Sequence, residues 1–219
     1  MFDSAPRLTH GDVSIRGIRL RDAKTLETEL QVNRPWLERW EATLPGTHPS
    51  GRFDTRSSIR SLLDADRAGT GLAFAIEVGG EFAGQLNVAS ITGGALGSST
   101  LGYWIARRFA GRGATPIAVA LATDHLMLGM GLHRVEVCIR PENLASLRVV
   151  EKLGFRYEGC RRRYIHIDGD WRDHLCFALV REELAEPLLG RFLAGRVPPF
   201  DRSVYPVDVG GDPRGATSA

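Results

Sequence analysis

One short stretch constrains this chain more than any other: a strand that runs through a glycine-rich turn into an alanine-rich helix. Leu101-Gly-Tyr-Trp-Ile105 has the apolar and aromatic content of a strand, Gly111-Arg-Gly113 forms the turn, and the alanine-rich segment extends to about Gly129. Such a turn aims backbone N–H groups from the positive end of a helix, and its glycines allow a ligand to approach closely. The stretch is suited to phosphate binding, but an R-x-x-G-x-G run alone more often marks an ordinary glycine-rich turn.

Strand and helix patterns alternate along most of the chain, which is typical of a mixed α and β domain. Apolar, β-rich stretches predict strands at residues 13–20, 72–78, 82–91, 101–105, 134–139, 155–167 and 171–180. Helices are expected to begin near Asp22, Asp54, Gly113, Asn143 and Arg181. Hairpin signals at Gly79-Gly80 and Asp168-Gly169 indicate an α/β (α+β) fold with one central, mostly antiparallel mixed sheet of about seven strands, flanked by helices.

The expected domain boundary lies near the C-terminus. Residues 1–197 carry the periodic pattern and are expected to form a single domain. Residues 198–219 are rich in proline, glycine and serine and lose that pattern, so we expect a loose C-terminal tail.

The composition argues against several classes of protein. The formal charge is +2, from 28 basic and 26 acidic residues, so we expect no direct nucleic-acid binding. No apolar stretch approaches the roughly 18 residues of a membrane helix, and residues 1–10 lack a signal-peptide layout; we expect a cytoplasmic protein without a membrane segment. Cys138, Cys160 and Cys176 show no C-x-x-C spacing, which indicates buried, reduced thiols and no metal site, with a reactive thiol as the alternative.

Three blocks in a fixed order carry a resemblance to a known family. The stretch from Leu101 to Gly113 comes first, followed by Gly131-Leu-His-Arg-Val-Glu-Val-Cys-Ile-Arg-Pro-Glu-Asn143 and then by Ala145-Ser-Leu-Arg-Val-Val-Glu-Lys-Leu-Gly-Phe155. Together they resemble the coenzyme-binding half of the GNAT superfamily of N-acetyltransferases, over roughly residues 100–160. We therefore expect the GNAT fold.

Other segments resemble one branch of that superfamily. Arg156-Tyr-Glu-Gly-Cys160, Ile167-Asp-Gly-Asp-Trp-Arg-Asp-His174 and Asn33-Arg-Pro-Trp-Leu-Glu-Arg-Trp40 are similar to segments of the RimJ and RimL ribosomal-protein N-terminal (alanine/serine) acetyltransferases. This branch also contains enzymes that acetylate small amines, so the resemblance indicates the group better than the acceptor.

The resemblance implies an acetyl-CoA site. Backbone groups of Tyr103, Trp104 and Ile105 are expected to pair with the pantetheine arm. Asn143 is expected to hydrogen-bond the same arm while serving as a helix N-cap. The pyrophosphate is expected at Arg108, Gly111, Arg112, Gly113, Ala114 and Thr115, although arginines beside a loop are more often simply solvated.

Candidates for the chemistry are less sharply defined. Many GNAT enzymes use a tyrosine as the general acid at the position that Val150 occupies here. Valine cannot donate a proton. Ser146 matches a serine that RimL-type enzymes place near the sulfur, and it also fits an ordinary helix. Glu136 is a candidate general base, although a strand carboxylate is more commonly ion-paired. The acceptor-side candidates are Trp36, Trp40, Glu41 and Asp168, whose ordinary roles are core packing, an exposed helix face and a turn.

The expected function is transfer of an acetyl group from acetyl-CoA to a protein N-terminus, such as that of a ribosomal protein beginning with Ser or Ala. One alternative is acetylation of a small amine, such as a polyamine, amino sugar or drug. Another is a non-catalytic acetyl-CoA-binding regulatory module, because the tyrosine is missing at Val150. We expect a monomer or homodimer.

Overall fold

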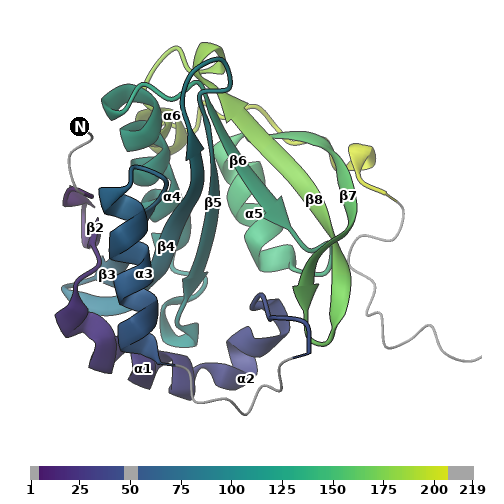
Figure 1. The fold of residues 1–219 in the computed structure, drawn as a ribbon. Helices are drawn as coiled ribbons and strands as arrows, with labels where there is room; N and C mark the ends of the chain where they lie inside the picture. Colours follow the sequence, from purple (N-terminus) through teal and green to yellow (C-terminus); the bar gives the residue numbers. More distant parts are fainter. Residues whose placement is uncertain (1–4, 47–53, 207–219) are drawn as a thin grey trace, which may run out of the picture.

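A computed structural model describes residues 5–46 and 54–206 (Figure 1). One mixed sheet of eight strands runs through the molecule in the order β1-β2-β3-β4-β5-β6-β8-β7. Every neighbouring pair is antiparallel except β5 and β6, which are parallel. The strands are β1 (Leu8–His10), β2 (Val13–Gly17), β3 (Leu72–Val78), β4 (Glu81–Thr92), β5 (Ser98–Ile105), β6 (Arg134–Ile139), β7 (Arg156–Ile167) and β8 (Asp170–Val180).

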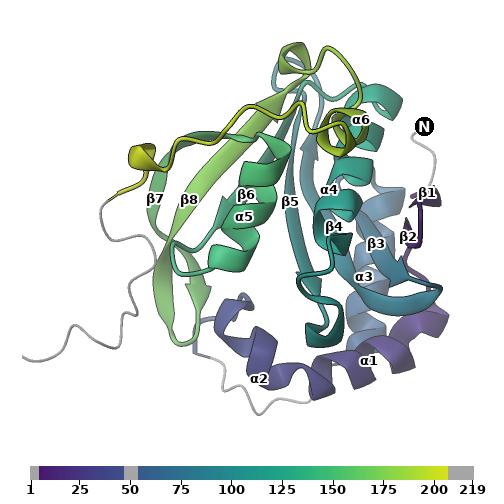
Figure 2. The same ribbon diagram turned by 180° about the vertical axis from the view of Figure 1, so that it is seen from behind.

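Helices cover both faces of this sheet. They are α1 (Ala23–Val32), α2 (Arg34–Leu37), α3 (Thr55–Arg67), α4 (Ala114–Asp124), α5 (Leu144–Leu153) and α6 (Leu188–Leu193). Figure 1 shows α3 over one face, and Figure 2 shows α4, α5 and α6 over the other. The main core lies on the α4 and α5 side and includes the fully buried side chains of Phe74, Phe155 and Phe177. The expected mostly antiparallel sheet with flanking helices is confirmed.

The boundaries of two helices follow from local chemistry. The side chain of Asp54 accepts hydrogen bonds from the backbone of Arg56 and Ser57 at the start of α3. Asn143 caps α5 through the backbone N–H of Ser146, and α5 ends at Gly154 in a left-handed conformation with φ +74°. The predicted starts near Asp54 and Asn143 are confirmed.

The parallel pair β5 and β6 separates partway along its length. Their register ends at Leu101 opposite Val137, whereas β5 continues to Ile105 while paired with β4 alone. Figure 1 shows the two strands diverging toward the end of the molecule where α1 and α2 lie. At the C-terminal end of β5, the edge that faces away from β4 is thereby left without a strand partner.

The structure differs from the sequence expectation at the C-terminal end. Residues 181–193 do not form one helix: a 3-10 turn covers Arg181–Glu183, and α6 begins only after Pro187. Proline lacks an N–H and disfavours helix at the residue before it. The carboxylate of Asp124 fixes the new start by accepting the N–H groups of Leu188 and Leu189.

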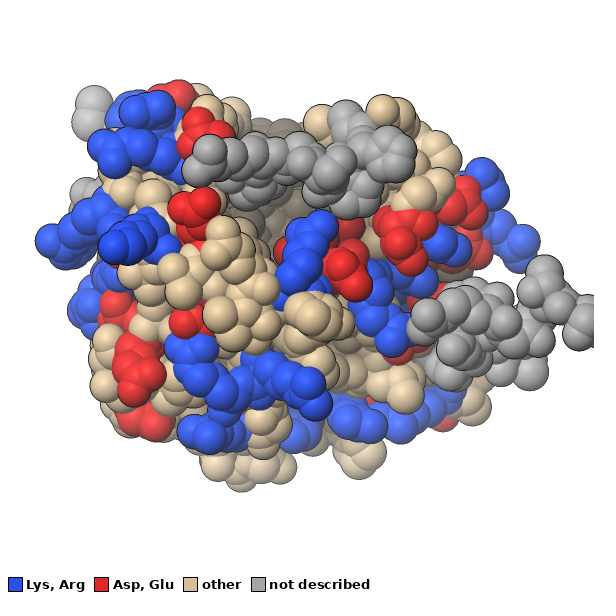
Figure 3. Space-filling view, turned by 90° about the horizontal axis from the view of Figure 1, so that it is seen from below, with Lys and Arg blue, Asp and Glu red and all other residues tan. Residues whose placement is uncertain are grey.

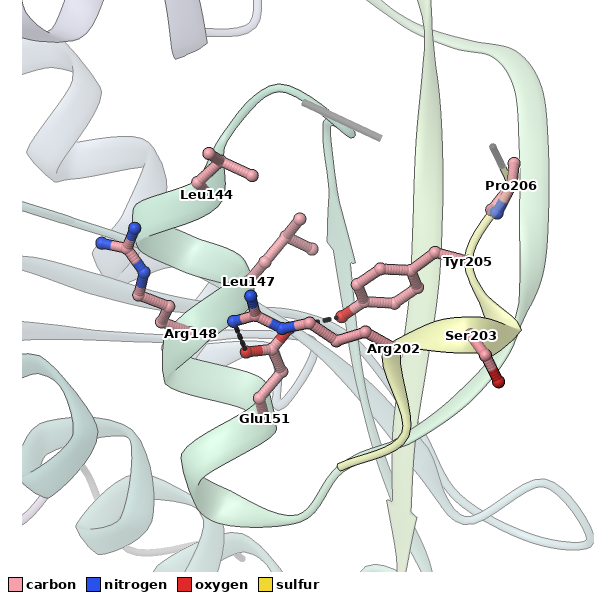
Figure 4. A pocket seen from close by; sticks show the side chains of 8 residues that line it. All are labelled: Leu144, Leu147, Arg148, Glu151, Arg202, Ser203, Tyr205 and Pro206. Carbon is pink, nitrogen blue, oxygen red and sulfur yellow. Dashed lines mark hydrogen bonds and ion pairs between the residues drawn. The ribbon is translucent and has the colours of Figure 1, made fainter. Parts of the chain in front are cut away.

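The segment expected to leave the domain after residue 197 packs against it as far as it is described. Phe200 and Tyr205 join a cluster of aromatic rings with Tyr157 and Phe177. The hydroxyl of Tyr205 donates to Glu151, which also pairs with Arg202 (Figure 4). The aromatic residues between the prolines thus hold residues 198–206 on the domain. Within the described ranges, no helix is long and apolar enough to cross a membrane.

Candidate active site

A cavity of about 820 Å³ lies beside the free edge of β5. Its walls are the end of β5, the turn into α4, the first turns of α5, and the segment from α2 through the 3-10 turn Glu38–Trp40. Residues from three separate stretches of sequence therefore meet at one place. The predicted site residues that line this cavity are Trp36, Trp40, Tyr103, Trp104, Ile105, Gly111, Gly113, Ala114, Thr115, Asn143 and Ser146.

The free edge of β5 presents its backbone groups in a defined order. The N–H of Ala106 bonds to the carbonyl of Ala83 at 2.7 Å, so in this antiparallel pair the N–H and C=O of Ile105 point away from β4. The pattern has a period of two, so the backbone groups of Tyr103 also face the open edge, whereas those of Trp104 face β4. The structure thus corrects the expectation for Trp104, whose backbone is used within the sheet.

Two side chains of the α1–α2 junction hold the end of this strand. Trp36 donates from its indole nitrogen to the carbonyl oxygen of Ile105 at 3.2 Å. The side-chain oxygen of the buried Asn33 accepts the backbone N–H of Arg107 at 2.8 Å. Hydrogen bonds therefore connect the α1–α2 wall of the cavity directly to the wall formed by the end of β5.

The glycine turn has the conformation that its sequence predicts. Gly111 and Gly113 have φ of +77° and +84°, which strains any residue with a Cβ, and neither has another atom within 4 Å of where a Cβ would stand. Gly113 is the N-cap of α4, so the first turn of that helix, whose N–H groups have no partner within the helix, lies at the cavity. An anion can approach this backbone without steric hindrance.

The cations near the turn are distributed differently from the expectation. Arg108 forms a two-fold ion pair with Glu29, and Arg112 lies over the ring of Phe109; neither is among the cavity-lining residues. Arg148 and Lys152, one turn apart on α5, line the cavity instead. Figure 3 shows lysine and arginine side chains gathered along this end of the molecule.

Two hydroxyl-bearing residues meet where β5 approaches α5. The phenol of Tyr103 donates to the backbone carbonyl of Ser146 at 3.4 Å, and both residues line the cavity. Burial raises the pKa of Tyr103, so its hydroxyl keeps its proton. Val150 is fully buried in the core one turn further along α5. The sequence predicted only the backbone of Tyr103; the contact with α5 spans distant parts of the chain, and no sequence pattern marked it.

The acceptor-side wall is fixed by buried Arg140. Its guanidinium donates to the carbonyl of Arg39 at 2.7 Å and lies 5.4 Å from the ring centroid of Trp40. It also pairs with Glu142, which lines the cavity. Beyond Trp40, the N–H of Thr43 bonds to the carbonyl of His166 at 2.8 Å, so the chain is tied to the β7–β8 hairpin. The segment that follows Trp40 is thereby connected to the hairpin.

Besides Arg108 and Arg112, three predicted residues lie outside the cavity lining. Glu136 is buried on β6 and paired with Arg134 and Arg161, and these partners hold the pKa of its carboxyl below the usual value despite the opposing effect of burial. Such a carboxylate is a poor proton acceptor, which argues against the role predicted for it. Glu41 pairs with Arg34, and Asp168 occupies the hairpin turn with φ +51°.

A second cavity of about 410 Å³ adjoins the first along α5. Leu144 and Arg148 line both, and the C-terminal segment around Tyr205 forms the far wall (Figure 4). This wall depends on how the C-terminal segment packs, which no local sequence pattern predicts.

Comparison with known proteins shows which family this chain is similar to. Residues 12–156 match the acetyltransferase (GNAT) domain family. A probable N-acetyltransferase, YjcK of Bacillus subtilis, is 36% identical over 100 residues, 46% of this chain and 55% of that protein. The [ribosomal protein uS5]-alanine N-acetyltransferase of Escherichia coli is 29% identical over 177 residues, 79% of this chain and 90% of that protein.

A solved structure extends the similarity to nearly the whole chain. Mycobacterium smegmatis RimJ, in complex with CoA-disulfide, superposes with a TM-score of 0.82 at 36% identity, over 91% of this chain and 97% of that one. The family match covers more than half of the sequence and includes the turn, the open strand edge and the start of α5. This chain belongs to the GNAT acetyltransferase family.

Proposed function

We propose that this acetyltransferase moves the acetyl group of acetyl-CoA to the N-terminal α-amine of a protein, in the class of ribosomal proteins that begin with serine or alanine. The observation that carries the proposal is the cavity, in which the open edge of β5 and the glycine turn face a wall with Trp36 and Trp40. The similarity to RimJ and to the uS5-alanine N-acetyltransferase supports the acceptor class.

In this proposal the chain holds acetyl-CoA mainly with backbone groups. The N–H and C=O of Tyr103 pair with the pantetheine arm as an added strand would, which leaves the N–H of Ile105 for the acetyl group. The side-chain oxygen of Asn143 is occupied by its cap, so its NH₂ group is the donor that remains for the same arm. The N–H groups at the start of α4 hold the pyrophosphate, and Arg148 and Lys152 add positive charge.

The acceptor amine must be neutral to attack. An α-amine has a pKa of about 7.7–8.0, so a substantial fraction is neutral near physiological pH, whereas a lysine amine near 10.4 is almost wholly charged. Glu142 is the one acidic residue among the described residues that line the cavity, and its carboxylate forms an ion pair with Arg140. We therefore assign removal of the proton to water, which suffices for an α-amine but serves a lysine poorly.

The remaining chemistry is assigned to groups at the meeting point of β5 and α5. The N–H of Ile105 faces the open edge and is placed to donate to the developing oxyanion. The leaving thiolate then takes a proton, for which Ser146 is the predicted donor. The contact of the Tyr103 hydroxyl with α5 makes it a second candidate, since its raised pKa keeps the proton available.

The charges of the cavity argue against one class of small acceptor. Its described lining carries three cationic side chains, Arg39, Arg148 and Lys152, and the carboxylate of Glu142. A polyamine carries several positive charges and would be repelled, whereas a peptide presents one amine and a neutral backbone.

A thiol-release assay with matched acceptors tests the proposal. The panel contains peptides beginning with Ser or Ala, the same peptides blocked at the N-terminus, a polyamine and an aminoglycoside. We expect coenzyme A release with the free peptides alone. Faster release with a small amine would contradict the acceptor assignment, and coenzyme binding without release for any acceptor would favour the non-catalytic module.

A further inference from the structure

We propose that Cys138 and Cys176 form an oxidisable dithiol site, at which a peroxide or a small disulfide converts the two thiols into one cross-strand disulfide. The two residues lie directly opposite each other in the antiparallel pair β6–β8, and their sulfur atoms are 3.3 Å apart. Both are free thiols. This inference does not depend on the acceptor of the acetyl group.

The backbone geometry suits a covalent bond. Directly opposed residues in an antiparallel pair have Cα atoms about 4.5–5.5 Å apart, within the range of about 4.4–6.8 Å found in disulfides. Both side chains lie on one face of the sheet, opposite the face where Val137 and Phe177 join the core. The bond therefore forms with little movement of the strands.

The third cysteine provides an internal contrast. Cys160 is exposed on the edge strand β7, and its register partner on β8 is Leu175, the neighbour of Cys176. Successive side chains of a strand alternate between faces, so Cys160 belongs to the other face of the sheet. It is accessible to reagents but is not placed to join the pair.

The surroundings favour a thiolate in this pair. The hydrogen bond from Cys138 and the nearby Arg161 guanidinium lower the pKa of Cys176, against the opposing effects of burial and of Glu136. The guanidinium of Arg161 lies 3.5 Å from the Cys138 sulfur, and a carboxylate oxygen of Glu136 lies 3.4 Å from the same sulfur. The thiolate is the reactive form of cysteine, and the lowered pKa of Cys176 favours that form.

The reaction with hydrogen peroxide balances in two steps. The Cys176 thiolate attacks a peroxide oxygen, which forms a sulfenic acid and a hydroxide that is protonated to water. The sulfur of Cys138 then attacks the sulfenic sulfur, forming the S–S bond and releasing a second water that carries away the Cys138 proton. Two thiols lose two electrons and one peroxide becomes two waters; an external dithiol reverses the change. Cys138 is partly exposed and gives the oxidant access.

Peptide mapping of the full wild-type chain tests the inference directly. The protein is treated with a small excess of hydrogen peroxide, alkylated, digested without reductant and analysed by mass spectrometry. We expect a linked peptide pair that joins Cys138 to Cys176, lacks two hydrogens and disappears after dithiothreitol, with Cys160 alkylated. A link that contains Cys160, or equal alkylation of all three cysteines, would overturn the proposal.

Matched variants sharpen the result. Cys160→Ser should form the link as the wild type does, whereas Cys138→Ser and Cys176→Ser should not form an intramolecular link. Arg161→Gln, at an exposed position, should form the same link several-fold more slowly at neutral pH because the thiolate loses its cation. An unchanged rate would contradict the role of Arg161, and a link in either serine variant of the pair would contradict the site.

Discussion

The indole nitrogen of Trp36 donates a hydrogen bond to the carbonyl oxygen of Ile105, and this bond joins the two walls of the cavity. Trp36 lies on the wall that we assign to the acceptor, and Ile105 ends the strand edge that we assign to the coenzyme. Asn33 strengthens the connection by accepting the N–H of Arg107 two residues later. The position of one wall thereby fixes the other, which suits a reaction between two substrates.

We expect Trp36→Phe to weaken coenzyme binding and peptide turnover together. The ring is kept, but the Ile105 carbonyl loses its donor, and a hydrogen bond of this kind contributes about 1 kcal/mol, or roughly fivefold. Calorimetry and steady-state rates measure the two effects. Trp171→Phe, at an exposed position on the hairpin, is the control and should change neither. Wild-type behaviour of the Trp36 variant would contradict the coupling.

We expect Gly113→Asp to lower coenzyme affinity more than tenfold, or more than about 1.4 kcal/mol. The substitution adds a Cβ at φ +84° and a negative charge where we place the pyrophosphate. Gly131→Asp is a matched control, since Gly131 also has a left-handed φ, of +73°, and lies outside the cavity lining. Equal losses in both variants would assign the effect to strain alone.

Much of the coenzyme side was predictable from sequence, because it depends on local signals. Gly111 and Gly113 lie in the predicted turn, where both have a left-handed φ, and Asn143 caps α5 as its residue type predicts. The contacts that were missed join distant parts of the chain: Arg108 with Glu29, Tyr103 with Ser146, and Arg202 with Glu151. Local patterns do not encode such pairs, which depend on tertiary packing.

The two candidate acids can be separated by paired variants. If Ser146 protonates the thiolate, Ser146→Ala should reduce turnover by about 10²-fold or more while coenzyme affinity stays nearly constant. If the Tyr103 hydroxyl acts instead, Tyr103→Phe shows that loss. Single-turnover kinetics make the comparison where chemistry limits the rate. Full turnover in both variants would remove both hydroxyls from the mechanism.

A buried ion cluster that joins β2, β3 and the residue before α1 should make the free energy of unfolding depend on pH. Arg16 pairs with Asp22 at 2.7 Å and with Glu77 at 2.6 Å, and these contacts hold the pKa of both carboxyls below their usual values despite burial. Carboxyls with lowered folded-state pKa values stabilise the fold above their unfolded pKa, and this contribution is lost as pH falls through the folded pKa.

Denaturant titrations at pH 6 and at acid pH measure this dependence. Asp22→Asn should cost about 3 kcal/mol at pH 6 and proportionally less in acid, because the wild type also loses the pair there. Asp12→Asn, on the exposed turn between β1 and β2, should have little effect at either pH. A penalty for Asp22→Asn that does not change with pH would contradict the assignment of the pKa shift to this cluster.

The central claim, acetylation of a protein N-terminus, is tested most directly by locating the acetyl group on the product. A peptide that begins with Ser or Ala and also contains a lysine is incubated with the enzyme and acetyl-CoA and sequenced by tandem mass spectrometry. We expect a gain of one acetyl group on the α-amine, and no gain when that amine is blocked. Acetylation of the lysine in preference to the α-amine would contradict it.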